Sequence, residues 1–195
     1  MLNLKKILSR SLLAMVLGAC GGVFAAPVYH VTIDTSTLGN SNAVLDLELG
    51  ALTGSAAPVT ATLNHFMGAY GASDFSGNAS GSIGSSIYLV NDAGYSGLLQ
   101  SIMLGGLFSF DLSFDVGSGG LDGSSFTAML YNADFSATLG MDTPLVQIDL
   151  MPDQDDVVSP ANAFASVTAV PEPSTLLSMV TGLGLLGFGL RRRAR

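Results

Sequence analysis

Few side chains in this chain could do acid–base or metal chemistry, because it has two histidines and one cysteine beside fifteen carboxylates. His30 and His65 cannot build the usual zinc site of several histidines without help from carboxylates. His30 lies on the polar side of an expected strand, and His65 lies at the end of another. We therefore interpret both histidines as surface residues rather than metal ligands.

Two pairs of carboxylates have a spacing that could serve glycoside hydrolysis, in which one group acts as acid and the other as base or nucleophile. These pairs are Asp46 with Glu48 and Asp153 with Asp155. The chemistry needs an apolar pocket that raises the pKa of one carboxyl, and the sequence points to none. The chain also has no Trp to stack on a sugar and no G-x-S-x-G motif. We therefore predict a protein that is not an enzyme.

The densest acidic group, Asp153-Gln154-Asp155-Asp156, could present oxygen ligands to Ca²⁺. The candidate cation ligands are the three aspartates Asp153, Asp155 and Asp156. The group lacks the glycine and the terminal glutamate of an EF-hand loop. The alternative interpretation is a solvated turn before the last strand, with no metal or other cofactor.

Charges are strongly segregated along the chain. All seven basic residues lie before residue 11 or after residue 190, and no Lys or Arg lies between. Removing Glu172 from the fifteen acids leaves fourteen in the central body. The formal net charge of −8 excludes an ordinary nucleic-acid binder. In the body each carboxylate must face water, accept hydrogen bonds or bind a cation, because no Lys or Arg can pair with it.

The sequence pattern of the body predicts β-strands. From Phe108 to Val116, apolar and polar residues alternate with a period of two, which indicates a strand with one buried face. Leu45, Leu47 and Leu49 alternate with acids in the same way. We expect eight strands, at residues 29–33, 45–49, 59–65, 83–90, 108–116, 126–131, 145–150 and 164–170, with 98–104 as a ninth strand or a short helix.

Turn-forming residues separate these segments, and residues 68–86 are so rich in Gly and Ser that we expect a long flexible loop there. Alternation on one face favours antiparallel sheets packed on a common core. The predicted fold is therefore all-β, an antiparallel β-sandwich of jelly-roll type with eight or nine strands. It occupies residues 26–170 as a single acidic domain.

The N-terminus has the parts of a secretory signal peptide. A positive start is followed by an apolar run at 11–19 that is too short to span a bilayer, and then by small residues. Cleavage by signal peptidase after Ala25 places small residues at both recognition positions, so we assign residues 1–25 to the signal. The basic residues of the start are Lys5, Lys6 and Arg10.

A second interpretation of this region remains open. Leu17-Gly18-Ala19-Cys20 resembles a bacterial lipobox, in which Cys20 would be lipidated and retained to make a lipid-anchored surface protein. If Cys20 instead leaves with the signal, the mature chain has no cysteine. Its fold would then be stabilised by packing without disulfides.

The last 25 residues, 171–195, combine three features. Pro171-Glu172-Pro173 is followed by an apolar run at 176–190 and then by a basic cluster. As a helix, the run would extend about 22 Å, somewhat short of the hydrocarbon core of a bilayer. Flanking residues and snorkelling arginines can lengthen the span. The cluster of Arg191, Arg192 and Arg193 predicts a transmembrane helix whose end stays in the cytoplasm.

These C-terminal features together resemble the PEP-CTERM sorting signal of Gram-negative bacteria. The resemblance implies recognition of Pro171, Glu172 and Pro173 by exosortase, a membrane cysteine peptidase that cleaves near the tripeptide. It also implies an inner-membrane precursor that is later released or re-anchored at the cell surface. Proteins of this kind are linked to exopolysaccharide and biofilm matrix. The body, at residues 26–35, 45–49 and 107–112, resembles one group of PEP-CTERM proteins without an assigned activity.

From these features we expect an exported, noncatalytic protein of the cell surface or extracellular matrix. The alternative is a carbohydrate-binding module of the matrix that uses exposed tyrosines as platforms for sugars. The candidate tyrosines are Tyr29, Tyr70, Tyr88, Tyr95 and Tyr131.

Overall fold

The computed structural model describes residues 27–152, 154–159 and 163–170, together with Gly182 and Gly184. The predicted signal peptide, the sorting tripeptide, the arginine cluster and Cys20 lie outside these residues. The predicted membrane helix at 176–190 also lies outside them, apart from the two glycines. Among the described residues, no helix has both the length and the apolar character needed to cross a bilayer.

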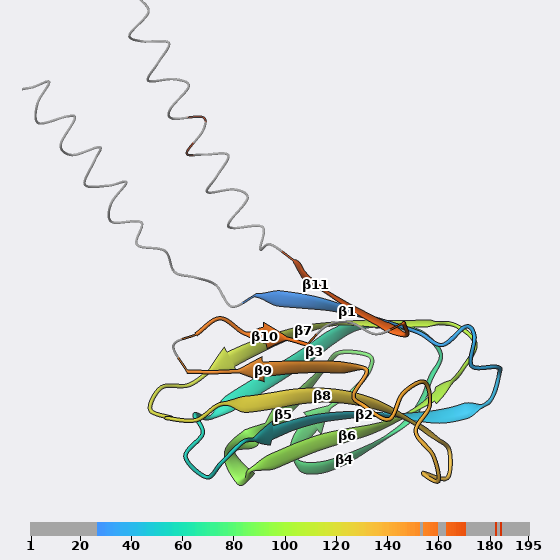
Figure 1. Ribbon diagram of the computed structural model, residues 1–195, viewed down its shortest axis with the longest axis horizontal. Coiled ribbons are helices and arrows are strands. Elements are labelled where there is room, and N and C mark those ends of the chain that lie inside the picture. Colours follow the sequence, from blue (N-terminus) through green and yellow to red (C-terminus); the bar gives the residue numbers. More distant parts are fainter. Residues whose placement is uncertain (1–26, 153, 160–162, 171–181, 183, 185–195) are drawn as a thin grey trace, which may run out of the picture.

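The described body is built from antiparallel strands with one short 3-10 helix, η1 (Asn91–Ala93) (Figure 1). The strands are β1 (Val28–Asp34), β2 (Asn42–Ala51), β3 (Val59–Met67), β4 (Tyr70–Gly81), β5 (Ser86–Val90), β6 (Tyr95–Met103), β7 (Leu107–Val116), β8 (Ser124–Asn132), β9 (Val146–Leu150), β10 (Val157–Val158) and β11 (Ala165–Val170). Their hydrogen-bonded order is β10-β9-β8-β2-β6-β4-β5-β3-β7-β1-β11.

Strand β4 joins two halves of this continuous sheet. Its first part pairs with β6, and its last part, from Asn78 to Gly81, pairs with β5. We call the half with β10, β9, β8, β2 and β6 the β2 sheet, and the half with β5, β3, β7, β1 and β11 the β7 sheet. The two ends of the order approach each other, because β9 contacts β11. The sheet is therefore nearly closed, like a flattened barrel.

The core lies between the two sheets and follows the predicted alternation. On β7, Phe108, Phe110 and Leu112 are fully buried while the intervening residues face outward. On β2, Leu45, Leu47 and Leu49 face the same core. Burial of these large side chains supplies the main driving force for folding of a chain that has no Lys or Arg in its body.

The predicted all-β, antiparallel architecture is confirmed, with differences in detail. The described residues form eleven strands rather than eight or nine, and the ambiguous segment 98–104 lies mostly in strand β6. The expected flexible loop at 68–86 is wrong, because it contains the twelve-residue strand β4. Most side chains of β4 are exposed, so the strand has no apolar alternation that a sequence could reveal. Backbone pairing to β6 and β5 holds it in place instead.

Candidate functional site

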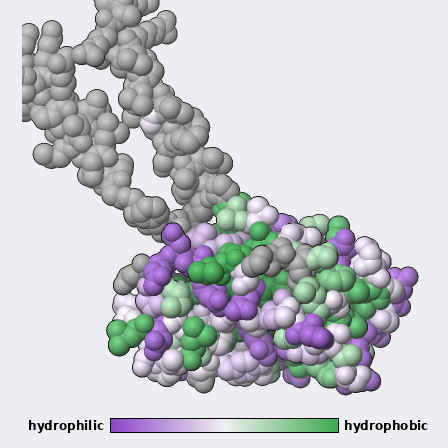
Figure 2. Space-filling view, in the orientation of Figure 1, coloured by the Kyte–Doolittle hydropathy of each residue, from purple (hydrophilic) through white to green (hydrophobic). Residues whose placement is uncertain are grey.

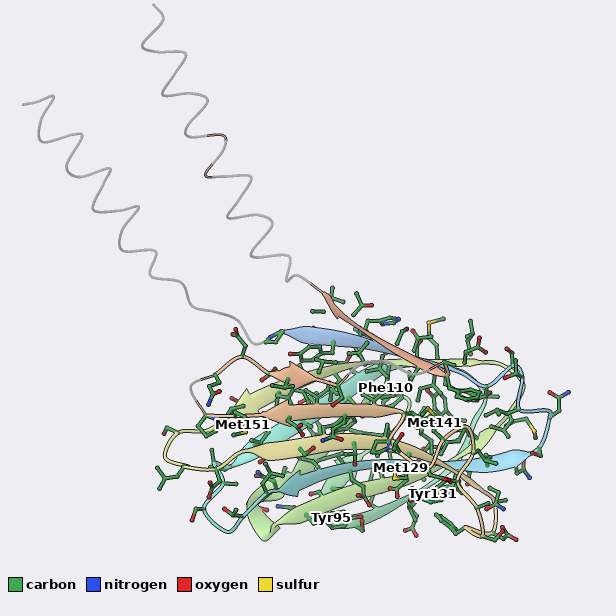
Figure 3. The ribbon with its side chains drawn as sticks, viewed as in Figure 1. Tyr95, Phe110, Met129, Tyr131, Met141 and Met151 are labelled. Atoms are coloured by element: carbon green, nitrogen blue, oxygen red, sulfur yellow. The ribbon has the colours of Figure 1, made fainter. Side chains whose placement is uncertain are left out.

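Two carboxylates lie side by side on the outer surface of the β2 sheet. Asp46 and Glu48 point away from the core on β2, since Leu45, Leu47 and Leu49 point into it. Asp46 lies opposite Met129 of β8 and Leu99 of β6. We call the surface formed by Asp46, Glu48, Tyr95, Met129 and Tyr131 the β2 face; Figure 3 labels Tyr95, Met129 and Tyr131 along it.

The environment of Asp46 holds it near half protonation at neutral pH. Burial raises the pKa of Asp46 to about 7, with further contributions from the charge of Glu48 and a hydrogen bond to it. Its Oδ1 atom is buried and has no hydrogen-bond partner. The sequence pointed to no environment able to shift the pKa of a carboxyl in this way. Burial of Asp46 between the neighbouring strands β6 and β8 supplies it.

Asp46 and Glu48 are close enough for the charge of Glu48 to raise the pKa of Asp46. A protonated Asp46 carboxyl beside Glu48 can both donate and accept hydrogen bonds at the surface. That is the chemistry that recognises hydroxyl groups.

Tyr95 borders the carboxylates at one end of the β2 face. Its hydroxyl donates a 3.0 Å hydrogen bond to Glu48 Oε1, and Ser76 Oγ donates to the Tyr95 hydroxyl at 3.4 Å. The tyrosine lies over Gly97, where an added Cβ would come within 2.6 Å of the Tyr95 hydroxyl oxygen. A glycine at position 97 therefore leaves room for this ring, which is 43% exposed.

A pair of aromatic rings lies at the other end of the β2 face. The Tyr131 ring lies 5.5 Å from that of Phe135, with 37° between the ring planes. Phe135 is 49% exposed and has a backbone φ of 58°. A bulky residue in this left-handed region is a backbone outlier, and such strain is frequent at binding sites.

The turn that carries Phe135 is held by hydrogen bonds on both sides of it. The Phe135 N–H donates to the Asn132 carbonyl at 3.1 Å, and Asn132 Nδ2 donates to Ser136 Oγ at 2.7 Å. Ser136 Oγ also donates to Asp134 Oδ1 at 2.8 Å. The exposed ring is thus presented by an ordered turn, which reduces the entropy lost when a ligand binds to it.

The structure separates the five candidate tyrosines. Tyr29 is buried in the core, with its ring 6.1 Å from that of Phe114. Tyr70 is partly buried and its ring packs edge-on against Phe108. These two tyrosines cannot serve as open platforms, and Tyr88 is exposed on the β7 sheet. Tyr95 and Tyr131 remain together on one face.

The two histidines meet at one carboxylate on the outer surface of the β7 sheet. His30 Nδ1 lies 2.7 Å from Asp111 Oδ1, and His65 Nδ1 lies 2.8 Å from Asp111 Oδ2. Both histidine side chains are exposed, as predicted, at 46% for His30 and 79% for His65. What the sequence did not predict is that they share a partner.

A β-bulge brings His65 to this cluster. The register between β3 and β7 shifts between Asn64 and Met67, and His65 has a positive φ of 52°. In a regular strand, His65 would point into the core like Leu63, because side chains alternate. The bulge turns the His65 side chain outward toward Asp111. The sequence does not reveal this bulge, because it supports only a regular alternation of side chains.

The cluster is a hydrogen-bonded link across three strands rather than a metal centre. The carboxylate uses one oxygen for each imidazole, so it lies between the rings instead of facing a common point with them. Burial raises the pKa of Asp111, but the hydrogen bonds from His30 and His65 outweigh it, and the pKa is lowered. Among the described residues, no group of three or more His, Cys, Asp or Glu side chains is arranged to hold a metal ion.

The predicted calcium ligands lie only partly within the described chain. Asp153 lies outside it, and Asp155 is exposed. Asp156 accepts a 2.6 Å hydrogen bond from the Tyr29 hydroxyl. One of the three candidate ligands is therefore engaged in the fold.

The segment that precedes the sorting tripeptide is the edge strand β11. β11 pairs with β1, and Val170 is the register partner of Val28. The start of β1 and the end of β11 therefore lie side by side, as Figure 1 shows. Pro171 follows Val170 directly in the sequence.

Comparison with known proteins identifies one feature of the chain. Residues 169–193 match the PEP-CTERM protein-sorting motif. This match confirms the predicted resemblance of the C-terminal segment and implies export with processing by an exosortase-type membrane protease. No curated protein and no solved structure matches the chain.

Proposed function

We propose that this protein is an exported, noncatalytic component of the cell surface or extracellular matrix, released or re-anchored after exosortase-type processing. The observation that carries the proposal is the sorting motif at 169–193, which begins at the end of strand β11. Pro171 cannot continue the ladder between β11 and β1, because proline lacks a backbone N–H. Cleavage near the tripeptide would therefore remove the tail and leave the described body intact.

The body is suited to this role as a stable module. A continuous buried core fills the space between the two sheets. In the strand order, β4 pairs with β6, and the pairs β3–β7 and β2–β8 lie outside it. This nesting supports the predicted jelly-roll type of fold. The fourteen acids of the body keep it soluble after release.

Replacing Pro171, Glu172 and Pro173 by alanine in the native host tests this proposal. We expect uncleaved precursor to accumulate in the membrane fraction, because the tripeptide is the part read by the protease. The matched control replaces the adjacent Ser174 and Thr175 by alanine and should be processed normally. Normal release of the tripeptide variant would contradict the proposal.

The N-terminal alternatives are separated by intact-mass measurement of the mature protein from the same host. Cleavage by signal peptidase after Ala25 gives a chain without Cys20. Lipidation would give a chain that begins at Cys20 and carries added acyl mass, and the protein would then be a lipid-anchored surface protein.

A second candidate function is carbohydrate binding in the matrix, favoured by the β2 face. Tyr95 and the Tyr131–Phe135 pair flank the carboxyls of Asp46 and Glu48, so apolar ring faces and hydrogen-bonding groups share one surface. Tyr95 lies opposite Gly50 and Tyr131 opposite Val44, six residues away along β2. This is a spacing of about 20 Å, long enough for several sugar units.

Retention on the exopolysaccharide of the native host tests the second candidate. Phe135→Ala should weaken retention, because it removes an exposed ring without touching the core. Tyr88→Ala is the matched control, since its ring has similar exposure but lies on the β7 sheet. Equal retention of both variants and the unaltered protein would exclude the β2 face as the binding surface.

A further inference from the structure

Two exposed leucines lie at the end of the body from which the sorting segment leaves. Leu121 is 86% exposed and Leu52 is 55% exposed. Leu121 lies in the glycine-rich connection between β7 and β8, and Leu52 lies in the connection between β2 and β3. Exposed leucines can be buried against an apolar surface without breaking contacts inside the fold. Their removal from water is then favourable in free energy.

The two connections are held against each other. The Leu121 N–H donates to the Ser55 carbonyl at 3.0 Å, and the Leu52 N–H donates to the Gly123 carbonyl at 3.0 Å. The Thr53 hydroxyl donates a hydrogen bond to the Asp122 carboxylate, so this carboxylate has a partner within the two connections. We call these two connections, residues 52–58 and 117–123, the leucine loops.

Strand register places the leucine loops beside the exit of the chain. Val28, the partner of Val170, also pairs with Ser113 of β7. β7 then runs past this point to Val116, which pairs with Val59 at the start of β3. Beyond Val116 and Val59 the chain enters the leucine loops. In Figure 1 these connections lie at the same end of the body, on the left, where β1 begins and β11 ends.

The tether to the membrane is short. Five residues, 171–175, separate the end of β11 from the apolar run that begins at Leu176. Even fully extended, they reach only about 17 Å. In a membrane-anchored precursor, this end of the body therefore stays near the bilayer, and a tethered contact can form even if its intrinsic affinity is weak.

We propose that the leucine loops form a membrane-contacting surface of the anchored precursor, with Leu52 and Leu121 inserted at the lipid interface. This inference rests on the proposed function, because it requires the sorting segment to anchor the chain. The body carries fourteen acids and no Lys or Arg, so anionic lipids repel it once it is free. The contact thus lasts only as long as the tether, and cleavage of the tail releases the body. Figure 2 shows hydrophobic atoms exposed at this end.

Site-specific fluorescence on the full chain tests the proposal. The chain is produced with Cys20→Ser in a Gram-negative host without the sorting protease, and carbonate-washed membranes are prepared. An environment-sensitive dye is attached to Leu121→Cys, to Leu52→Cys or to the control Leu107→Cys. Leu107 is 62% exposed and begins β7 at the opposite end of the body.

We expect the emission of the dye at positions 52 and 121 to shift to the blue and to be quenched by spin-labelled phospholipid, while the dye at 107 behaves as in water. Water-like emission at 52 and 121 in a chain that stays in the membrane overturns this inference alone. Equal quenching at all three positions also overturns it. Loss of the chain from washed membranes overturns both the anchored precursor and the inference.

Discussion

The Tyr29 hydroxyl donates a 2.6 Å hydrogen bond to the Asp156 carboxylate and so links the two ends of the sheet. Tyr29 belongs to β1, next to one edge strand, and Asp156 directly precedes β10, the other edge strand. Burial and the contact with Asp156 raise the pKa of Tyr29, so the hydroxyl remains a donor at all physiological pH values. This bond joins two parts of the fold that backbone pairing leaves apart.

Replacing Tyr29 by Phe should lower the free energy of unfolding by about 1–2 kcal/mol, because a hydrogen bond to a charged group is lost. The ring contact with Phe114 is kept in this variant, so the core should remain packed. Urea unfolding at pH 7 measures the effect. Tyr88→Phe is the control. Because Tyr88 is 44% exposed, loss of its hydroxyl should change the free energy of unfolding little.

The shared carboxylate of Asp111 should contribute to stability in a pH-dependent way. Asp111→Asn weakens the hydrogen bonds to His30 and His65, and we expect a loss of about 0.5–1 kcal/mol in unfolding free energy at pH 7, as for other exposed side-chain pairs. Because the pKa of Asp111 is lowered in the folded state, its contribution is present above the ordinary aspartate pKa. It disappears as the pH falls through the folded pKa.

The difference in unfolding free energy between the unaltered protein and Asp111→Asn should therefore shrink toward zero in acid. Urea unfolding of both proteins between pH 7 and pH 2 measures this difference directly. A gap that stays constant down to the lowest pH would show that the variant acts through packing rather than through the carboxylate charge.

The strands with one apolar face could be predicted from the sequence because their alternation reports burial directly. The alternate residues Phe108, Phe110, Leu112 and Phe114 on β7, and Leu45, Leu47 and Leu49 on β2, face the core as expected. Strand β4 could not be predicted in this way. Its first part is paired with β6 and its last part with β5, while most of its side chains face water, so its sequence resembles a loop.

The features of the candidate sites depend on contacts between strands that are distant in the sequence. Asp111 meets His30 because the two residues are register partners on β7 and β1. It meets His65 only because a bulge turns His65 outward, and an irregular residue breaks the period on which prediction relies. The shifted pKa of Asp46 likewise arises from packing by neighbouring strands. The sorting segment could be recognised because its signal is contiguous, and it matches a known motif.

Asp46 should make the protein less stable as the pH rises. Its pKa in the folded protein is about 7, above the ordinary value of 3.8, so folding retains a proton that the unfolded chain releases. Stability therefore falls between pH 4 and pH 7. Asp46→Asn removes this dependence and, allowing for solvent screening, should stabilise the protein by about 1 kcal/mol at pH 8 with little effect at pH 4.

Thermal unfolding at pH 4 and pH 8 measures this effect. Asp74→Asn is the control, because Asp74 is an exposed carboxylate on β4, which lies on the far side of β6 from β2. It removes the same formal charge without relieving a buried one. If both variants gain the same stability at pH 8, the effect comes from net charge and not from burial of Asp46.

The bend of β4 between the two sheets should depend on glycine at position 77. Gly77 has a φ of 63°, and a Cβ added there would lie 2.1 Å from the carbonyl oxygen of Tyr95. Gly77→Ala therefore combines a disfavoured backbone conformation with a clash against backbone that cannot move freely. We expect a loss of more than about 2 kcal/mol in unfolding free energy, measured by urea unfolding.

Gly39→Ala separates the two causes. Gly39 has a similar positive φ of 82°, but an added Cβ would meet nothing within 4 Å. This variant should lose only about 1–2 kcal/mol, the ordinary price of a left-handed conformation for a residue with a Cβ. If both variants lose the same amount, the close approach of β4 to β6 at Tyr95 does not constrain position 77. The junction between the sheets would then tolerate a side chain at the bend.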